Sequence, residues 1–486
     1  MNRRAVWTLL ITSIASLMVS LDSLVVSTAL PTLRIRLGAS LAQLEWTVNA
    51  YVLTLAVLLM TGAALGDRFG RRRMFITGLA TFTAASVACA LAQTPEWLIA
   101  ARAVQGAGAA LMLPLALALL GAAYEPSRLP AAFGIFAAVT GAGVVFGPLL
   151  GGAAIQVASW RWIFWLNVPL GVGAMVMASR RIAESHGPDS RIDFVGLLLI
   201  TGGVLGLVWA LVRGNSAGWG SREVLISLAA GVALAAAFVA WELRAHQPML
   251  PMRLFRSRSF SAGNAASACL FASALGAIFF VAQFLQVALG YSPLAAGLRL
   301  MPWGAAAFVV APLAGAQINR RGERPFIVTG MLLIAAGGAW LALEASPSVP
   351  YWAVVIPLTI AGVGMSLALP AAQSSAVGHV SPDQLGKASG TFTTLRQLGG
   401  ALGVAVAVAA FAGSGGYRTP SSFSHGFAAA LAVSAGLAFV GALAGLLVPR
   451  ARPAAAASAE PRVPRAAQAP QPAASRAASA QRGESL

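Results

Sequence analysis

The sequence predicts an all-α integral membrane protein with 14 transmembrane helices, and its composition, its apolar segments and the placement of its arginines support this. Hydrophobic residues make up 58% of the 486 residues, charged residues only 10%, and the mean hydropathy is +0.77. Soluble domains carry about 25% charged residues. Because this chain has too few charges to cover a water-facing surface, lipid is expected to be the solvent for most of it.

About 14 apolar segments are long enough to cross a hydrocarbon core of about 30 Å. They lie at 7–30, 44–65, 74–92, 97–120, 131–157, 162–179, 194–212, 224–241, 260–283, 295–318, 326–343, 351–369, 388–411 and 426–448. The first follows Arg3 and Arg4, as the apolar region of a signal peptide would. It is too long for that region, so we interpret it as the first membrane helix.

The arginines indicate the orientation, because cytoplasmic loops of membrane proteins are enriched in basic residues. An even number of spans with a cytoplasmic N-terminus places the clusters at 71–73 and 320–324 on the cytoplasmic side. We therefore expect a multi-pass protein of the cell (inner or plasma) membrane with both termini in the cytoplasm. Residues 450–486 are rich in Ala, Pro, Ser and Arg and are predicted to form a disordered cytoplasmic tail. Contact of this tail with anionic lipid is the alternative.

An internal repeat divides the chain. The loop at 66–73 and the loop at 318–324 align with Asn319 opposite Asp67, and each is the second cytoplasmic connection of six helices. Parallel repeats of this kind build transporters that alternate access to a site near the membrane midplane. We expect a six-helix bundle at 1–180, an inserted two-helix segment with cytoplasmic flanking loops at 181–258, and a second six-helix bundle at 259–449.

Several classes of protein are disfavoured. The net charge of +18 does not indicate a nucleic-acid binder, because no basic patch lies on a soluble fold. The sequence has no Walker motif, metal-ligand cluster or set of nucleophile and base, so neither an enzyme nor a metal or cofactor site is expected. Cys89 and Cys269 each lie in an apolar run, which favours core packing over a disulfide.

Five motifs together identify a family. They are Leu21-Asp22 to Ala29-Leu30-Pro31, Gly66-Asp67-Arg68-Phe69-Gly70-Arg71-Arg72, Arg102-Ala103-Val104-Gln105-Gly106-Ala107-Gly108, Gly143 to Gly152, and Trp160 to Pro169. In this order the chain resembles the major facilitator superfamily, specifically its fourteen-helix drug:proton antiporter branch, over residues 7–449. The resemblance implies a proton-coupled exporter of small amphipathic compounds such as drugs or antibiotics, working by alternating access. Its partners would be that substrate, protons and the lipid bilayer; it would need no cofactor beyond the proton gradient, and we expect a monomer.

Asp22 and Arg102 are charged residues inside predicted spans. An apolar environment disfavours a charged carboxylate, so Asp22 can hold a proton in one conformation and release it in another. In the family the corresponding residues take part in proton coupling, which makes Asp22 and Arg102 the predicted coupling pair. The alternatives are that Asp22 only hydrogen-bonds across helices and that Arg102 extends to the membrane surface. Arg299 and Arg396 lie near the starts of spans, where they too could extend outward.

The loop with Asp67, Arg68, Gly70 and Arg71 is a predicted conformational latch. Asp67 can pair with Arg71, while glycine gives the short turn its backbone freedom. Breaking that pair as the halves move is the role that the family implies. A solvated basic loop is the alternative. Ala63 departs from the family pattern, which usually has Gly there.

Gly143, Gly147 and Gly151 recur one helical turn apart, with Pro148 and Gly152 beside them. Small residues at this spacing let helices approach closely, and proline can kink a helix. Ordinary helix packing explains this pattern equally well. In the family, however, the motif is typical of antiporters, which favours export.

The substrate site is predicted only as a set of polar and aromatic candidates that could line a central cleft. They are Trp46, Asn49, Tyr51, Gln105, Asn167, Phe279, Phe280, Gln283 and Gln286. Two functions stay open beside drug export. One is a proton-coupled importer of a metabolite, and the other is a non-transporting membrane sensor on the same fold.

Overall fold

The computed structural model describes residues 3–124, 129–186, 193–245, 248, 250, 252–378, 380 and 385–450. All regular secondary structure in these ranges is helical, as the apolar segments predict. The predicted cytoplasmic tail lies outside the described residues, except for Arg450. Both cysteines are free thiols.

The helices fall into three groups along the chain. The first group comprises α1 (Arg3–Leu37), α2 (Leu41–Phe69), α3 (Arg71–Ala90), α4 (Pro95–Ala123), α5 (Leu129–Val157), α6 (Trp162–Trp165) and α7 (Asn167–Arg181). Then follow α8 (Phe194–Ala217), α9 (Arg222–Glu242) and the short 3-10 helix η1 (Met252–Arg256). The last group comprises α10 (Arg258–Val287), α11 (Pro293–Arg321), α12 (Glu323–Leu343), α13 (Tyr351–Val377), α14 (Leu385–Ser414) and α15 (Pro420–Leu446).

Thirteen helical segments in the described ranges are long and apolar enough to cross a membrane, judged by length and composition. The predicted seventh span corresponds to α8, in which the described apolar stretch is shorter, Phe194–Leu207. The chain is therefore an all-helical, multi-pass membrane protein. The total of 14 spans stays a prediction.

Helix ends differ from the predicted spans, because hydropathy detects the lipid-facing length and not the hydrogen-bonded length. The first span was predicted at 7–30, whereas α1 runs from Arg3 to Leu37 and continues through Pro31. Helical hydrogen bonds extend into the polar residues Arg34 and Arg36, which add no apolar signal. The end of the first helix was thus predicted several residues too early.

The predicted sixth span is divided into α6 and α7, which meet at Leu166. Pro169 is the third residue of α7, and its ring nitrogen has no hydrogen to donate to the carbonyl of Trp165. This missing bond falls at the junction and accounts for the break. A hydropathy pattern cannot detect it, because the apolar character continues across the junction.

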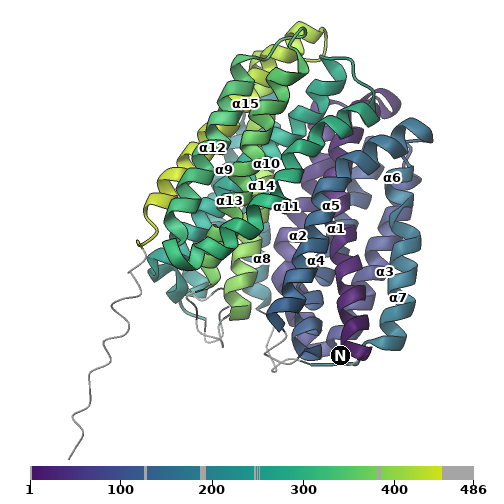
Figure 1. Ribbon diagram of the computed structural model, residues 1–486, viewed down its shortest axis with the longest axis vertical. Helices are drawn as coiled ribbons and strands as arrows, with labels where there is room; N and C mark the ends of the chain where they lie inside the picture. The colour runs from purple at the N-terminus through teal and green to yellow at the C-terminus, as the bar shows by residue number, and fades with distance from the viewer. Residues whose placement is uncertain are drawn as a thin grey trace, which may run out of the picture. The chain divides into compact units, whose positions relative to one another are not determined.

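The helices pack as two groups joined along a few helix pairs (Figure 1). In the first group α4 lies against α2 and α3, and α1 lies against α5 and α7. In the last group α10 lies against α13, α14 and α15, and α12 lies against α13 and α15. The pairs α5–α11 and α2–α14 connect the groups.

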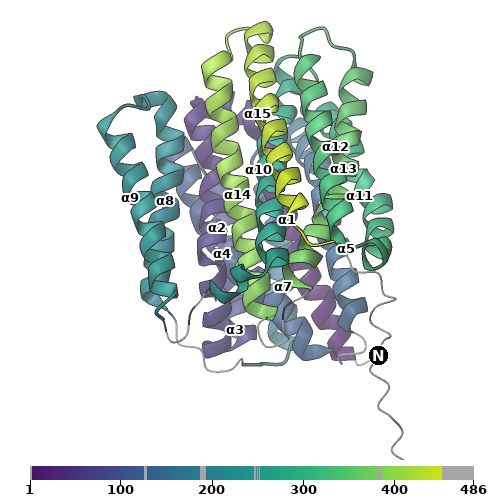
Figure 2. The ribbon, with the colours of Figure 1, turned by 90° about the vertical axis from the view of Figure 1, so that its left-hand side faces the viewer.

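The inserted pair α8 and α9 stands at one side of the helical bundle (Figure 2). Helix α8 packs on α9 and also touches α2 and α14, so it contacts both groups. Leu53 of α2, Val204 of α8 and Ala405 of α14 form one small apolar cluster there. This placement agrees with an insertion between two halves, although the domain boundaries themselves stay a prediction.

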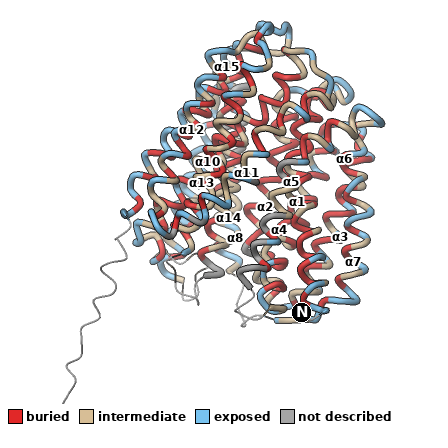
Figure 3. The backbone as a smooth tube through the Cα atoms, in the orientation of Figure 1, coloured by how far each residue is buried: buried red, intermediate tan, exposed pale blue. Residues whose placement is uncertain are grey.

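The hydrogen bonds between described residues that join the two groups lie at the end of the molecule remote from the N-terminus. Gln286 Nε2 donates to the Thr28 carbonyl at 3.0 Å, and the Leu294 N–H donates to Gln156 Oε1 at 3.3 Å. The Arg34 guanidinium lies 3.9 Å from the ring centroid of Tyr417. Buried residues gather where the helices face one another, and exposed ones lie mainly on the outside (Figure 3).

Backbone contact between α10 and α14 depends on Gly403. A Cβ added at Gly403 would overlap the backbone of Ala272. We predict that Gly403→Ala lowers the thermal unfolding temperature of the detergent-purified protein, because overpacking costs about 1–3 kcal/mol. Gly436→Ala is the matched control, because a Cβ there meets nothing within 4 Å. Equal melting temperatures for the two variants would contradict the proposed contact.

Candidate functional site

The centre of the candidate site is the carboxylate of Asp22, which is fully buried in the middle of α1. Arg102 of α4, 1% exposed, places its Nη1 in direct contact with Asp22 Oδ2. Two amides complete the shell of the carboxylate: Gln105 Nε2 donates to Oδ1 at 2.9 Å and Asn167 Nδ2 donates at 3.1 Å. Helices α1, α4 and α7 thus meet at one carboxyl group.

The guanidinium of Arg102 is held on several sides. Its Nε donates to the Thr47 carbonyl at 3.2 Å, and its Nη1 donates to Gln105 Oε1 at 2.7 Å. Its carbon lies 4.2 Å from the ring centroid of Tyr51. This geometry favours pairing with Asp22 over extension of Arg102 to the membrane surface.

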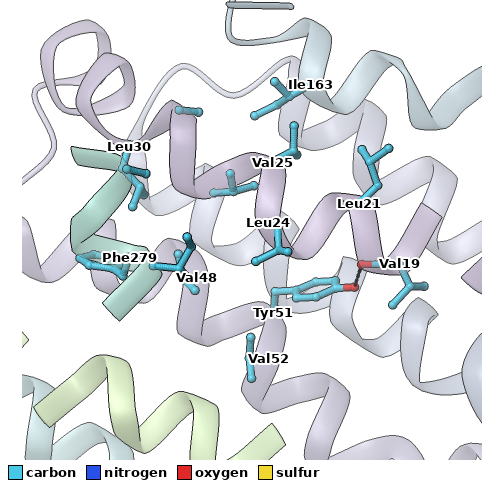
Figure 4. Packing of buried hydrophobic residues seen from close by; sticks show 14 of the residues in the cluster. Val19, Leu21, Leu24, Val25, Leu30, Val48, Tyr51, Val52, Ile163 and Phe279 are labelled. Atoms are coloured by element: carbon cyan, nitrogen blue, oxygen red, sulfur yellow. Dashed lines mark hydrogen bonds between the residues drawn. The ribbon is translucent and has the colours of Figure 1, made fainter. Parts of the chain in front are cut away.

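Tyr51 closes the site on the side of α2. Figure 4 shows its ring among Leu24, Val52 and other apolar side chains, with its hydroxyl directed at the carbonyl of Val19, to which it donates at 3.4 Å. Helix α4 reaches α2 closely because Gly106 has no side chain, and a Cβ there would overlap the Tyr51 backbone. The Arg102 to Gly106 segment therefore supplies both the charge and the close approach that positions it.

A buried ion pair is stable only when its remaining donors and acceptors are also satisfied. The network meets that condition, since Gln105 also donates to Ser86 Oγ at 2.9 Å. Chemically, Asp22 has two ways to be neutralised: by Arg102, as observed, or by a proton. Protonation would remove the charge that holds Arg102 in place.

The predicted latch lies entirely within the first group of helices in this conformation. Asp67 Oδ1 accepts from Arg71 Nε at 2.8 Å, and Gly70 has a φ of 103°, which favours glycine. The Arg68 guanidinium lies 5.4 Å from the centroid of the Phe69 ring. The predicted pair of Asp67 and Arg71 is present, without a contact to the second group among the described residues.

Sequence reasoning missed Glu184, which binds the start of α3 beside this loop. Its carboxylate accepts from the backbone N–H of Arg72 at 2.8 Å and of Arg73 at 3.3 Å. An anion at a helix N-terminus is stabilised by the helix dipole. The only signal for it in the sequence was an acid placed after a predicted span, which is too common to be specific.

The glycine motif of α5 faces two neighbours. A Cβ at Gly143, Gly147 or Gly151 would lie within 3.3 Å of atoms of α1. A Cβ at Gly152 would overlap the backbone of Pro293 in α11, and Gly297 of α11 lies in the same way against Pro148. The motif therefore sits both inside the first group and at its junction with the second.

The predicted substrate residues separate into two sets. Tyr51, Gln105 and Asn167 belong to the Asp22 network. The others lie toward the contact between the groups: Gln286 at Thr28, Gln283 as the acceptor of the Tyr417 hydroxyl, Phe279 against Phe280 with ring centroids 4.9 Å apart, and Trp46 packed on the apolar cluster of α2, α8 and α14. Asn49 donates to Glu45 at 3.4 Å.

Two buried charges lie outside the predicted pair. Glu45, near the start of α2, is only 1% exposed and was not singled out from the sequence, because one acid at the end of a span usually reaches solvent. Arg396 lies within α14, with its carbon 4.8 Å from the centroid of Phe271. Arg299, which was equally open, lies 3.8 Å from the centroid of Tyr291 and donates to the Ala295 carbonyl at 3.2 Å.

Comparison with known proteins assigns the sequence to a family. The model of the Major Facilitator Superfamily matches residues 12–404 and 264–481. The chain is 36% identical to the tetracenomycin C resistance and export protein of Streptomyces glaucescens, covering 82% of this chain and 74% of that protein. It is 35% identical to a probable actinorhodin transporter of Streptomyces coelicolor (85% and 73%), and 34% identical to the multidrug resistance protein Stp of Mycobacterium tuberculosis (84% and 76%).

Solved structures agree on the fold. A POT family transporter in complex with a thioalcohol-conjugated peptide superposes with a TM-score of 0.70 at 14% identity, covering 90% of this chain and 95% of that one. A bacterial homologue of the human lysosomal transporter Spinster, in an inward-facing and unoccupied conformation, gives 0.65 at 16% identity, covering 92% and 98%. At such identities these matches show the fold alone.

The pairing of Asp22 with Arg102 predicts non-additive stabilities. Asp22→Leu leaves a buried unpaired guanidinium and should cost about 3–5 kcal/mol, and Arg102→Met should be similarly destabilising. The double variant should lose much less than the sum of the two. Denaturant unfolding of the four proteins measures the coupling.

The exposed pair of Arg213 and Glu223, 3.7 Å apart, is the control for this cycle. Its coupling should stay below about 1 kcal/mol, because water screens exposed charges. Additive losses for Asp22 and Arg102 would show that their contact does not carry stability.

Proposed function

The chain belongs to the major facilitator superfamily, which makes it a membrane transporter and not an enzyme, and we propose that it is a proton-coupled exporter of amphipathic organic compounds. It is related to exporters of antibiotics and to multidrug resistance proteins over more than four-fifths of its length. These relatives support export over import of a metabolite. They also count against a non-transporting sensor.

The observation that carries the coupling proposal is the buried pair of Asp22 and Arg102. In the observed conformation Arg102 neutralises Asp22, and the amides of Gln105 and Asn167 hold the carboxylate in place. A proton arriving at Asp22 would replace Arg102 as the neutralising charge and free the link between α1 and α4. Proton binding would then change helix packing, which is what coupling requires.

The direction of access follows from the predicted orientation. With the N-terminus in the cytoplasm, the hydrogen bonds of Gln286 with Thr28 and of Leu294 with Gln156 lie on the outer side. The observed conformation would then be the one that is closed toward the outside. Export requires the opposite conformation as well, in which these outer contacts separate.

Two motifs have roles in this cycle. The packing of Gly152 on Pro293 and of Gly297 on Pro148 would seal the outer junction of the halves, because backbones in direct contact leave no space for water or ions. Asp67 and Arg71 would act at the cytoplasmic side, where their pair holds the turn between α2 and α3. When the halves rock, this turn must move relative to the second bundle.

Proton coupling predicts the behaviour of Asp22→Asn. The amide keeps the size of the carboxyl group and part of its hydrogen bonding but cannot exchange a proton. In proteoliposomes with an imposed pH gradient, we expect this variant to lose gradient-driven dye transport by at least about tenfold. Glu96→Gln is the control, since Glu96 is an exposed acid at the start of α4. Transport by Asp22→Asn at the wild-type rate would contradict the coupling role.

A further inference from the structure

Arg396 is a cation of the second bundle without a counter-charge. It is the twelfth residue of α14, which places it about 17 Å along the helix from Leu385. Its Nε is buried and has no hydrogen-bond partner among the described residues, and no carboxylate of those residues lies within 4 Å of its nitrogens. Arg102 of the first bundle, by contrast, is fully paired.

Aromatic rings from two helices take the place of a counter-ion. The guanidinium carbon lies 4.8 Å from the ring centroid of Phe271 in α10 and 5.9 Å from that of Phe392 in α14. Contact of a cation with a ring face compensates only part of the lost hydration. A cation in this setting therefore still favours a nearby anion.

The second bundle itself offers no such anion at this depth. Between residues 258 and 450 the acids are Glu323, Glu344 and Asp383. Glu323 begins α12 and Glu344 follows its last residue, so both lie at helix ends. Asp383 lies outside the described residues. The neutralising group must therefore come from outside these helices.

The position suits a transported molecule. Helix α10 contacts α1, and α14 contacts α2, so both helices of the Arg396 site border the first bundle. In transporters with repeated bundles, the substrate binds between the repeats near the midplane. Arg396 lies at comparable depth on the second bundle.

We propose that Arg396, Phe271 and Phe392 form a substrate subsite that binds the anionic group of an aromatic compound, such as a carboxylate. The guanidinium provides paired donors that match a carboxylate, including the presently unbonded Nε. The two phenyl rings supply apolar surface for the aromatic body. This inference rests on the proposed export function and narrows its substrates to amphipathic anions.

The test compares two dyes with the same xanthene ring system and opposite charge. Carboxyfluorescein is anionic and rhodamine 6G is cationic, and fluorescence polarisation measures the binding of each to the full-length protein in detergent. We expect the wild type to bind carboxyfluorescein more tightly. Arg396→Gln should weaken its binding at least about tenfold, because a charged hydrogen bond is lost. Binding of rhodamine 6G should stay the same or improve.

Arg299→Gln is the matched control, because Arg299 also lies over aromatic rings of the second bundle but donates to a backbone carbonyl. It should leave carboxyfluorescein binding unchanged. Arg396→Lys, which keeps the charge without the paired donors, should lose only part of the affinity. Phe271→Leu, which removes the ring but not the charge, should also weaken binding, and it tests the site if Arg396→Gln does not fold.

Three results would overturn the proposal. They are unchanged carboxyfluorescein affinity in Arg396→Gln, an equal loss in Arg299→Gln, and a wild type that does not bind carboxyfluorescein up to about 1 mM, the upper end of common transporter and enzyme affinities. Binding is measured without a proton gradient. A failure of proton coupling at Asp22 would therefore leave this test intact, and the two proposals can fail separately.

Discussion

The structure of the first bundle is organised around the need to neutralise a carboxylate in an apolar interior. Asp22 cannot remain charged there unless a cation and hydrogen-bond donors surround it. Arg102, Gln105 and Asn167 supply them, and they come from α4 and α7. The charge therefore fixes the relative positions of three helices.

Close approach of the backbones is the second requirement. Gly106 brings α4 against Tyr51 of α2, so that the ring covers the guanidinium of Arg102. Gly151 and Gly152 bring α5 against α1 and α11 in the same way. Without a hydrophobic driving force between helices in lipid, such contacts and the polar network supply much of the specificity of packing.

The two bundles share a repeat but differ in their charges. The first contains a complete ion pair, whereas the second contains Arg396 against two phenyl rings and no acid at that depth among its described residues. The loop repeat shows the same asymmetry, since Asn319 replaces the acid of Asp67. One bundle is thus equipped for proton exchange, and the other offers an unpaired cation. This difference suits an exporter in which the coupling and substrate groups lie on opposite sides of the central interface.

The sequence by itself determined the membrane class, the succession of apolar helices, the repeat, and the importance of Asp22 and Arg102. These follow from composition and from the cost of charge in lipid, which are local properties of the chain. Only the tertiary structure decided that Asp22 and Arg102 touch, that Gln105 and Asn167 complete their shell, that Glu184 binds the loop of Asp67, and that Arg396 has no counter-ion. Residues distant in sequence meet through helix packing, and no pattern along the chain specifies which helical faces will adjoin. The break at Leu166 and the extension of α1 past Pro31 were missed for a related reason, because hydropathy records affinity for lipid and not the hydrogen bonds of the backbone.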